Sequence, residues 1–219
     1  MPRSWFLVLA VLGTGATASA QSTEAATDAV QSSEAARSHG PSVLASLDVG
    51  FALDGVSPNG QPGALARIAV DLGAFELALE AHGGGPDTIE TARLAFHVAR
   101  GAIRAEVLYE LVDDGEWRLP IGVALGLSGW ARLTTTRDAT LEAAGGATSG
   151  GFTAGLVARA QWLPRALGGI VGLEIGIGAD LVTPSPRFVI DDGGTTTVLA
   201  TLWPVSPHAS LGIVVRASP

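Results

Sequence analysis

Apolar residues alternate with small or charged residues over a series of strand-length segments that begins at Val43. In the first segment, Val43 to Leu53, every odd position is apolar, and the even positions include Asp48. Successive side chains of a β-strand point to opposite faces, so this period of two gives a strand one apolar face and one polar face. The pattern predicts an all-β domain.

Similar segments follow along the chain, each with arginines, carboxylates or glycines opposite the apolar residues. They are residues 66–72, 75–81, 92–98, 103–111, 117–127, 152–162, 171–177 and 195–216. The apolar positions change parity across Gly73-Ala74, which a two-residue hairpin loop would produce. A second change of parity at Arg100-Gly101 predicts either another hairpin or a glycine-centred β-bulge.

The number of strands depends on Gly101 and on the final segment, which contains Pro204 and Pro207. Two hairpins there would give ten strands, whereas a bulge and one bent final strand would give eight. Eight strands place long loops at one end of the sheet and short turns at the other, the asymmetry of outer-membrane barrels. The long loops would be residues 54–63, 82–88, 134–149 and 183–194, and the short turns 73–74, 113–116 and 163–169. We therefore expect a closed antiparallel up-and-down transmembrane β-barrel of eight strands, with one long strand from Ile89 to Leu111.

The first 41 residues predict export. Residues 1–20 hold one charge, Arg3, then an apolar stretch and a Thr-Ala-Ser-Ala sequence that fits cleavage of a signal peptide after Ala20. The apolar stretch is far shorter than the roughly 20 residues of a spanning helix, so a membrane anchor is the weaker alternative. Residues 21–41, rich in Ala, Ser, Glu and Thr, predict a flexible periplasmic tether, or a segment that docks on a partner or plugs the barrel. Residues 42–219 would form the barrel.

Composition narrows the partners and the chemistry. The chain has 21 acidic residues against 13 basic ones, all of them arginine, and its net charge of −8 argues against nucleic acid as a partner. It has no cysteine, which excludes disulfides, zinc–thiolate sites and a cysteine nucleophile. We therefore expect that closure of the sheet stabilises the fold.

Three features favour a membrane barrel over a soluble periplasmic lipocalin-like barrel, which would carry its apolar face inside. The polar face holds glycines and charges of both signs, and the mean hydropathy of +0.36 is high for an exported soluble domain. Aromatic residues lie near predicted strand ends, as an interfacial girdle requires. These residues are Phe75, Trp117, Phe152, Trp162 and Trp203. We expect the protein in the outer membrane, in contact with lipid.

The pattern resembles a known family. A leader, an Ala/Ser-rich tether, polar faces such as that of Gly176-Ile177-Gly178 and a long final strand are similar to those of the small OmpA- and OmpX-like outer-membrane barrels of Gram-negative bacteria. The resemblance covers residues 42–219 and implies a monomeric eight-stranded barrel. One difference is that such barrels usually end in an aromatic residue, whereas this sequence ends in Val-Arg-Ala-Ser-Pro.

The polar faces predict a lumen filled with paired charges. An eight-stranded barrel has room for side chains but not for an aqueous channel, and a selective pore would carry an excess of one sign. Eight carboxylates, seven arginines and one histidine would face inward: Asp48, Asp71, Glu76, Glu80, Glu106, Glu110, Glu174, Asp180, Arg67, Arg93, Arg104, Arg118, Arg132, Arg159, Arg216 and His97. We therefore expect a closed lumen.

Catalytic, metal and cofactor sites are not predicted. The candidates for nucleophile and base are Ser128 or Ser149 with His82, His97 or His208, and no spacing links them. The pairs Asp113-Asp114 and Asp191-Asp192 fit turn chemistry better than a cation site, and Gly83-Gly84-Gly85 lacks the lysine of a phosphate loop.

Two functional classes stay open from the sequence. The first is a non-catalytic envelope barrel whose longer extracellular loops contact lipopolysaccharide or a surface partner. The second is a small channel, transport or lipid-modifying barrel. The first is our expectation because the predicted lumen charges nearly balance.

Overall fold

The computed structural model describes residues 41–55, 60–90, 92–137, 146–192 and 195–217. Ten strands form in these residues, joined by short connections and one 3-10 helix. The strands are β1 (Ser42–Ala52), β2 (Gln61–Asp71), β3 (Phe75–Glu90), β4 (Leu94–Asp113), β5 (Trp117–Thr136), β6 (Ala147–Trp162), β7 (Val171–Thr183), β8 (Arg187–Asp192), β9 (Thr195–Thr201) and β10 (Val205–Ala217), and the 3-10 helix is η1 (Arg165–Leu167).

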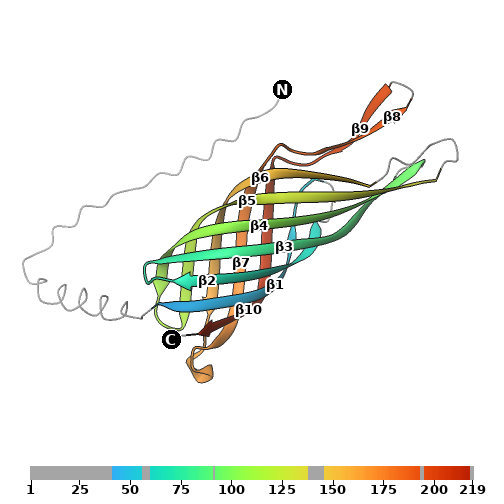
Figure 1. The fold of residues 1–219 in the computed structure, drawn as a ribbon. Helices are drawn as coiled ribbons and strands as arrows, with labels where there is room; N and C mark the ends of the chain where they lie inside the picture. The colour runs from blue at the N-terminus through green and yellow to red at the C-terminus, as the bar shows by residue number, and fades with distance from the viewer. Residues whose placement is uncertain (1–40, 56–59, 91, 138–145, 193–194, 218–219) are drawn as a thin grey trace, which may run out of the picture. The chain divides into compact units, whose positions relative to one another are not determined.

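Eight of these strands close into one antiparallel barrel (Figure 1). Its order is β1-β10-β7-β6-β5-β4-β3-β2, and β1 pairs with both β2 and β10. Each barrel strand therefore pairs with the next barrel strand along the chain, and β1 pairs with β10 to close the barrel. Only β8 and β9, which lie between β7 and β10 in the sequence, are left out of the barrel. The predicted eight-stranded up-and-down barrel is confirmed.

The barrel has a turn end and a loop end. The turn end carries the connections 72–74, 114–116 and 163–170, and the loop end carries 53–60, 91–93, 137–146 and 184–204. Residues 82–88, predicted as a long loop, instead continue β3 as far as Glu90, so the connection to β4 is short. The long strand that we expected to begin at Ile89 begins at Leu94, because Ile89 pairs from β3 with Phe96 of β4.

The change of parity at Gly101 has a different cause from either predicted one. Gly101 pairs in regular register with Gly83 and Gly129. The bulges lie elsewhere, in β3 between Gly84 and Asp87 and in β4 between Glu110 and Asp113. The pleat of β4 therefore runs through Gly101 unchanged. What changes there is the environment, since Phe96 points inward into an apolar cluster, whereas Ile103 points outward.

The final segment is not one bent strand, as we had expected. Residues 195–201 form β9, which pairs with β8 in a separate two-stranded sheet, and β10 begins only at Val205. Pro204 separates the two strands, and its carbonyl oxygen accepts a hydrogen bond from the N–H of Val182. The predicted loop 183–194 thus contains β8.

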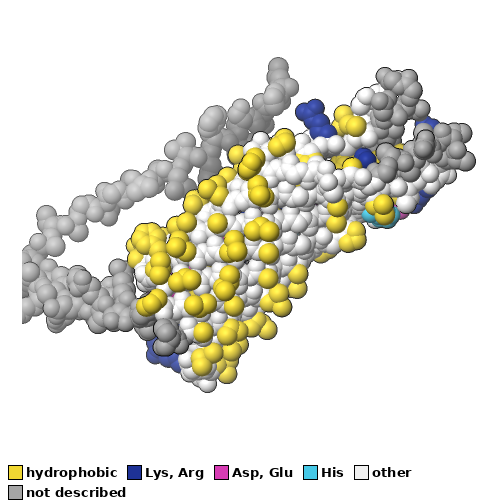
Figure 2. All heavy atoms as spheres, viewed as in Figure 1, with side chains coloured by type: hydrophobic (Ala, Val, Ile, Leu, Met, Phe, Trp, Pro, Cys, Tyr) yellow, Lys and Arg dark blue, Asp and Glu magenta, His cyan; other side chains and the backbone are white. Residues whose placement is uncertain are grey.

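The outer surface of the barrel is apolar. Large hydrophobic side chains from every barrel strand are exposed there, for example Leu47, Leu125 and Ile177. Figure 2 shows hydrophobic side chains over the visible face of the barrel, with charged side chains only towards its ends. A lipocalin-like barrel has the opposite orientation, with its apolar face inside.

Two apolar clusters lie inside the sheet, one towards each end. The turn-end cluster comprises Leu44, Ala69, Ala78, Leu163 and Val214. The loop-end cluster comprises Leu94, Phe96, Val98, Trp130, Val182, Phe188 and Leu202. The second cluster therefore joins the long strands β4 and β5 to β8 and to the segment before β10.

Within the described residues, no helix has the length and hydropathy needed to cross a membrane. The predicted signal peptide (1–20) and nearly all of the predicted tether (21–41) lie outside the described residues.

Candidate functional site

The inward faces of the strands bring a network of ion pairs together inside the barrel, and Arg159 of β6 lies at its centre. Its guanidinium contacts Glu106 Oε1 at 2.8 Å and Glu174 Oε1 at 2.9 Å, and it also pairs with Glu80. These side chains come from β4, β7 and β3, so one arginine joins four strands. All four side chains are almost completely buried.

Two further arginines extend this centre. Arg67 of β2 donates from Nε to Glu106 Oε2 at 3.0 Å and pairs with Glu76. Arg104 of β4 contacts Asp180 at 2.8 Å and also pairs with Glu80. Because Glu80 and Glu106 are shared between arginines, the pairs form one connected network.

A second group of charges lies at the turn end. Arg118 contacts Glu110 at 2.7 Å and Asp71 at 3.1 Å, and Arg216 contacts the same Asp71 at 3.2 Å. Gln161 accepts a hydrogen bond from Arg118 and donates one to Glu174, which links this group to the centre.

Most of the charges predicted to face the lumen take part in this network. They are Asp48, Arg67, Asp71, Glu76, Glu80, Arg104, Glu106, Glu110, Arg118, Arg159, Glu174, Asp180 and Arg216. Three predicted members lie elsewhere. Arg93 is exposed in the connection before β4, and His97 lies on the opposite face from Phe96, with Nδ1 3.0 Å from Thr88 Oγ1. Arg132 lies over the ring of Phe96, 5.8 Å from its centroid.

Arg100 is a buried arginine that the sequence analysis missed. We assigned Arg100 to a reversal of the strand, although it continues the inward series of Ala102 and Arg104. It donates to Ser206 Oγ at 2.9 Å, lies 3.9 Å from Asp180 and stacks over Trp130.

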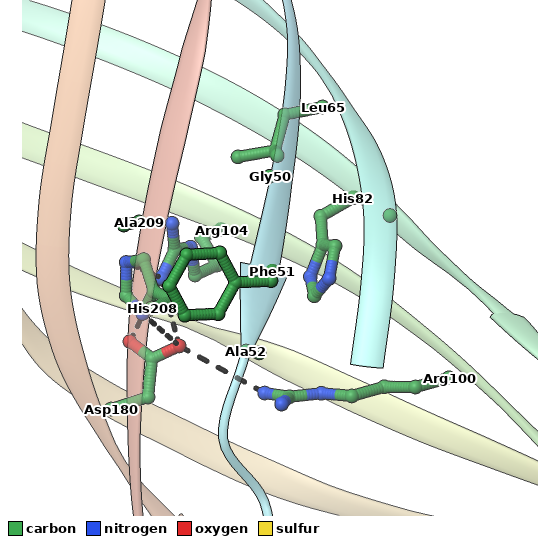
Figure 3. Close-up of a pocket in the computed structure, with 11 residues that line it drawn as sticks. Gly50, Phe51, Ala52, Leu65, His82, Arg100, Arg104, Asp180, His208 and Ala209 are labelled. Atoms are coloured by element: carbon green, nitrogen blue, oxygen red, sulfur yellow. Dashed lines mark hydrogen bonds and ion pairs between the residues drawn. The ribbon is translucent and has the colours of Figure 1, made fainter. Parts of the chain in front are cut away.

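Arg100 lines a small cavity near the loop end, together with His82, Arg104, Asp180 and His208 (Figure 3). The two imidazoles approach this cavity from β3 and β10, and His208 Nδ1 lies 3.7 Å from Asp180 Oδ2. The volume of about 20 Å³ suffices for one water molecule.

The described residues provide no assembled nucleophile and base. No hydrogen bond joins Ser128 or Ser149 to His82, His97 or His208 in this part of the chain, and Ser128 Oγ is buried without a partner. No group of three or more His, Asp or Glu side chains forms a metal site within the described ranges. Gly83-Gly84-Gly85 lies within β3 and not in a phosphate loop.

Asp113 and Asp114 accept backbone hydrogen bonds within the turn between β4 and β5. Asp113 Oδ1 accepts a hydrogen bond from the N–H of Gly115, and Asp114 Oδ1 accepts from the N–H groups of Trp117 and Glu116. These backbone donors hold the pKa of the Asp114 carboxyl below its usual value. The side chains of Asp191 and Asp192 lie outside the described residues.

The five predicted girdle aromatics are on the outside of the barrel. Trp117 and Trp162 stack at 6.0 Å near the turn end, where Phe75 packs edge-on against Tyr109. Phe152 and Trp203 are exposed towards the loop end, and the N–H of Trp203 donates to the carbonyl of Asp54.

Comparison with known proteins bears on the fold. No family profile matches the sequence, and no curated protein matches it. The structure is similar to a major outer membrane protein from Thermus thermophilus, with a TM-score of 0.58 and 13% identity over 82% of this chain and 100% of that chain. It is also similar to Ail, the attachment invasion locus protein of Yersinia pestis, solved with the heparin analogue sucrose octasulfate, with a TM-score of 0.51 and 8% identity over 82% of this chain and 99% of that chain. The resemblance to small OmpA- and OmpX-like barrels is therefore confirmed for the fold.

Proposed function

We propose that this protein is a non-catalytic outer-membrane barrel with a closed lumen, which acts in envelope structure or surface interaction. The observation that carries the proposal is the inverted arrangement of the barrel, with exposed aliphatic side chains outside and buried ion pairs inside. In water such an outer surface would be an aggregation hazard, whereas in a bilayer it is the lipid-facing band. The aromatic pairs Trp117–Trp162 and Phe75–Tyr109 suit the interface.

The proposed closure of the lumen is supported by what fills it. Arg67, Arg104 and Arg159 cross the interior and bind carboxylates from facing strands. Eight strands leave space for such side chains and little else. The turn-end and loop-end apolar clusters lie on either side of the charges.

The proposed surface role rests on the part of the sheet that extends past β1 and β2. We call residues 85–90, 94–100, 130–136 and 147–151 of β3 to β6 the projecting sheet. In the proposed orientation the projecting sheet lies outside the cell, together with β8 and β9. There it could contact lipopolysaccharide or a surface partner, and the neighbour Ail was solved with a heparin analogue.

The proposed location is tested by heat-modifiable migration. The full chain, expressed with residues 1–20, should fractionate with the outer membrane and run faster on a gel before boiling than after it. The matched control is the same chain without residues 1–20, which should remain in the cytoplasm. Mature protein that is freely soluble in water without detergent would contradict the proposal.

The proposed closed lumen is tested by conductance in a planar bilayer. We expect no stable single-channel current from the folded protein. A steady ohmic current would instead identify the channel class. Changes in the lipid A acyl chains on expression, seen by mass spectrometry, would identify a lipid-modifying enzyme.

A further inference from the structure

The charges inside the barrel do not balance. Among the described residues, the network joins more carboxylates than arginines. The carboxylates are Asp48, Asp71, Glu76, Glu80, Glu106, Glu110, Glu174 and Asp180, and the arginines are Arg67, Arg100, Arg104, Arg118, Arg159 and Arg216. A buried carboxylate without a counter-charge is costly, and it normally becomes neutral by taking a proton. The carboxyl group with the weakest pairing is therefore the one expected to be neutral.

Asp48 of β1 is the carboxyl group with the weakest pairing. Its side chain is 2% exposed, and the arginine that pairs with it, Arg159, has its nearest nitrogen 4.0 Å away. Every other carboxylate of the network has an arginine nitrogen within 3.1 Å. Asp48 Oδ1 is buried and accepts no hydrogen bond from the described residues.

The position of Asp48 explains how its carboxyl group comes to lie on the same side of the sheet as another acid. Asp48 pairs across β1 and β10 with Gly212, and Gly212 pairs across β10 and β7 with Glu174. A Cβ atom on Gly212 would lie 1.8 Å from Asp48 Oδ1, so the carboxyl group occupies the space that a side chain would fill. The absence of a side chain at Gly212 thus lets two acids from flanking strands meet.

The carboxyl groups of Asp48 and Glu174 both reach the hydroxyl group of Ser46. Ser46 Oγ lies 3.0 Å from Glu174 Oε1 and 3.5 Å from Asp48 Oδ2, and its single proton goes to the nearer oxygen of Glu174. A direct hydrogen bond between two carboxyl groups requires that one of them carries a proton. Glu174 is the ionised partner, because it contacts Arg159 at 2.9 Å.

We propose that Asp48 is a proton-binding site of the lumen, in which a neutral carboxylic acid donates a hydrogen bond to Glu174 across Gly212. The proton also lowers the excess of negative charge around Arg159. The charged groups that face Asp48 are Glu174 from β7, Arg159 from β6 and Glu80 from β3. This site does not depend on the membrane location proposed above.

Proton binding at Asp48 links the stability of the barrel to pH. In the unfolded chain Asp48 ionises as an ordinary aspartate, whereas the folded barrel holds the proton, so folding takes up a proton. Stability therefore falls as the pH rises above the ordinary aspartate pKa, because the unfolded state binds fewer protons than the folded state, and the fall ends where Asp48 ionises in the folded barrel. That ionisation would place an unpaired charge beside Glu174.

The direct test is infrared spectroscopy of the full mature chain folded in detergent micelles. We expect the carbonyl band of a protonated carboxylic acid at neutral pH, with loss of that band as the pH is raised. Asp48→Asn should lower the intensity of the band and Glu106→Gln, the matched control, should leave it unchanged. A wild-type spectrum without the band at neutral pH, or a band of wild-type intensity in Asp48→Asn, would overturn the proposal.

Unfolding in urea gives a second readout. Asn resembles the neutral acid but needs no proton to fold, so Asp48→Asn should match the wild-type midpoint near the ordinary aspartate pKa and exceed it increasingly as the pH rises towards 7. Glu106→Gln should lower the midpoint at pH 7, because Glu106 binds two arginines. An equal loss in both variants would contradict a neutral Asp48. A wild-type midpoint that rises with added Na⁺ or Mg²⁺, and does so only when Asp48 is present, would show a bound cation instead.

Discussion

The barrel body and the projecting sheet are built from the same strands, yet their inward faces differ. In the body, Ile103 and Val107 of β4 point outward and are exposed, while Arg104 points inward to carboxylates. In the projecting sheet the inward positions Phe96 and Val98 belong to the loop-end cluster. The change takes place along one strand without a change of pleat.

We attribute this difference to the proposed surroundings of each part, lipid for the barrel body and water for the projecting sheet, and not to the strand itself. A lipid-facing surface must be apolar, and the narrow interior can then hold ion pairs. A sheet in water needs its apolar face covered, and Phe188 and Leu202 cover it here. The two parts therefore obey the same rule on opposite sides of the proposed membrane boundary.

The largest expected effect comes from the centre of the body. Arg159→Met would leave Glu80, Glu106 and Glu174 short of a counter-charge, and removal of one partner from a buried ion pair costs about 3–5 kcal/mol. Urea unfolding in lipid vesicles, followed by tryptophan fluorescence, measures this loss. Arg137→Met is the control in the connection that follows β5, because the Arg137–Glu90 pair is exposed and worth about 0–1 kcal/mol. Equal losses in the two variants would refute the central role of Arg159.

Two outward leucines of β5 test whether the barrel body and the projecting sheet have different surroundings. Leu125 in the body is 64% exposed and Leu133 in the projecting sheet is 59% exposed, so the two side chains have similar accessibility. Leu125→Arg should destabilise the folded barrel by about 2–4 kcal/mol, as expected for arginine near the bilayer midplane, and Leu133→Arg by about 0–1 kcal/mol. The same unfolding assay separates them, and similar costs would place both positions in one medium.

The loop-end cluster should be destabilised when Leu202, one of the residues that cover it, is truncated. Leu202 is almost completely buried, and Leu202→Ala should cost about 2 kcal/mol, at the low end for such a truncation because a site near the end of a sheet can relax. Hydrogen exchange should speed up for amides of residues 94–99 and stay unchanged for residues 103–108. Faster exchange in both segments would mean that the two parts unfold together.

The smallest effect is expected at the turn end. The pKa of Asp114 is held below its usual value by the backbone N–H groups of Trp117 and Glu116, so its charge favours folding above the ordinary aspartate pKa. That contribution is lost as the pH falls through the lowered pKa. Asp114→Asn should therefore differ slightly from wild type at pH 7 and match it under acid. A difference that grows towards acid pH would reverse the sign.

Period-two alternation is a local property, so it was sufficient to predict the strands and most inward charges, whereas the choice of eight barrel strands came from the sorting of long and short connections. The pattern failed in the projecting sheet. Phe96 and Val98 followed the apolar pattern but face inward, so His97 was wrongly placed in the lumen and Arg100 was missed. If the inward positions are continued in steps of two from Arg104 through Ala102, the next one is Arg100.

Other features depend on contacts that no local pattern carries. β9 departs from the barrel because it pairs with β8, and Pro204 alone did not distinguish a bend from a break. The meeting of Asp48 with Glu174 requires the register across β10 that places Gly212 between them. Such pairings are set by closure of the whole sheet.

The most direct test of the account is the environment of two outward positions on β4. The chain has no cysteine, so Val107→Cys and His97→Cys can each carry a single nitroxide label. In vesicles we predict that the label at position 107 is relaxed by oxygen dissolved in lipid, and that the label at position 97 is relaxed by a water-soluble nickel chelate. The same response at both positions would contradict a membrane boundary between the barrel body and the projecting sheet.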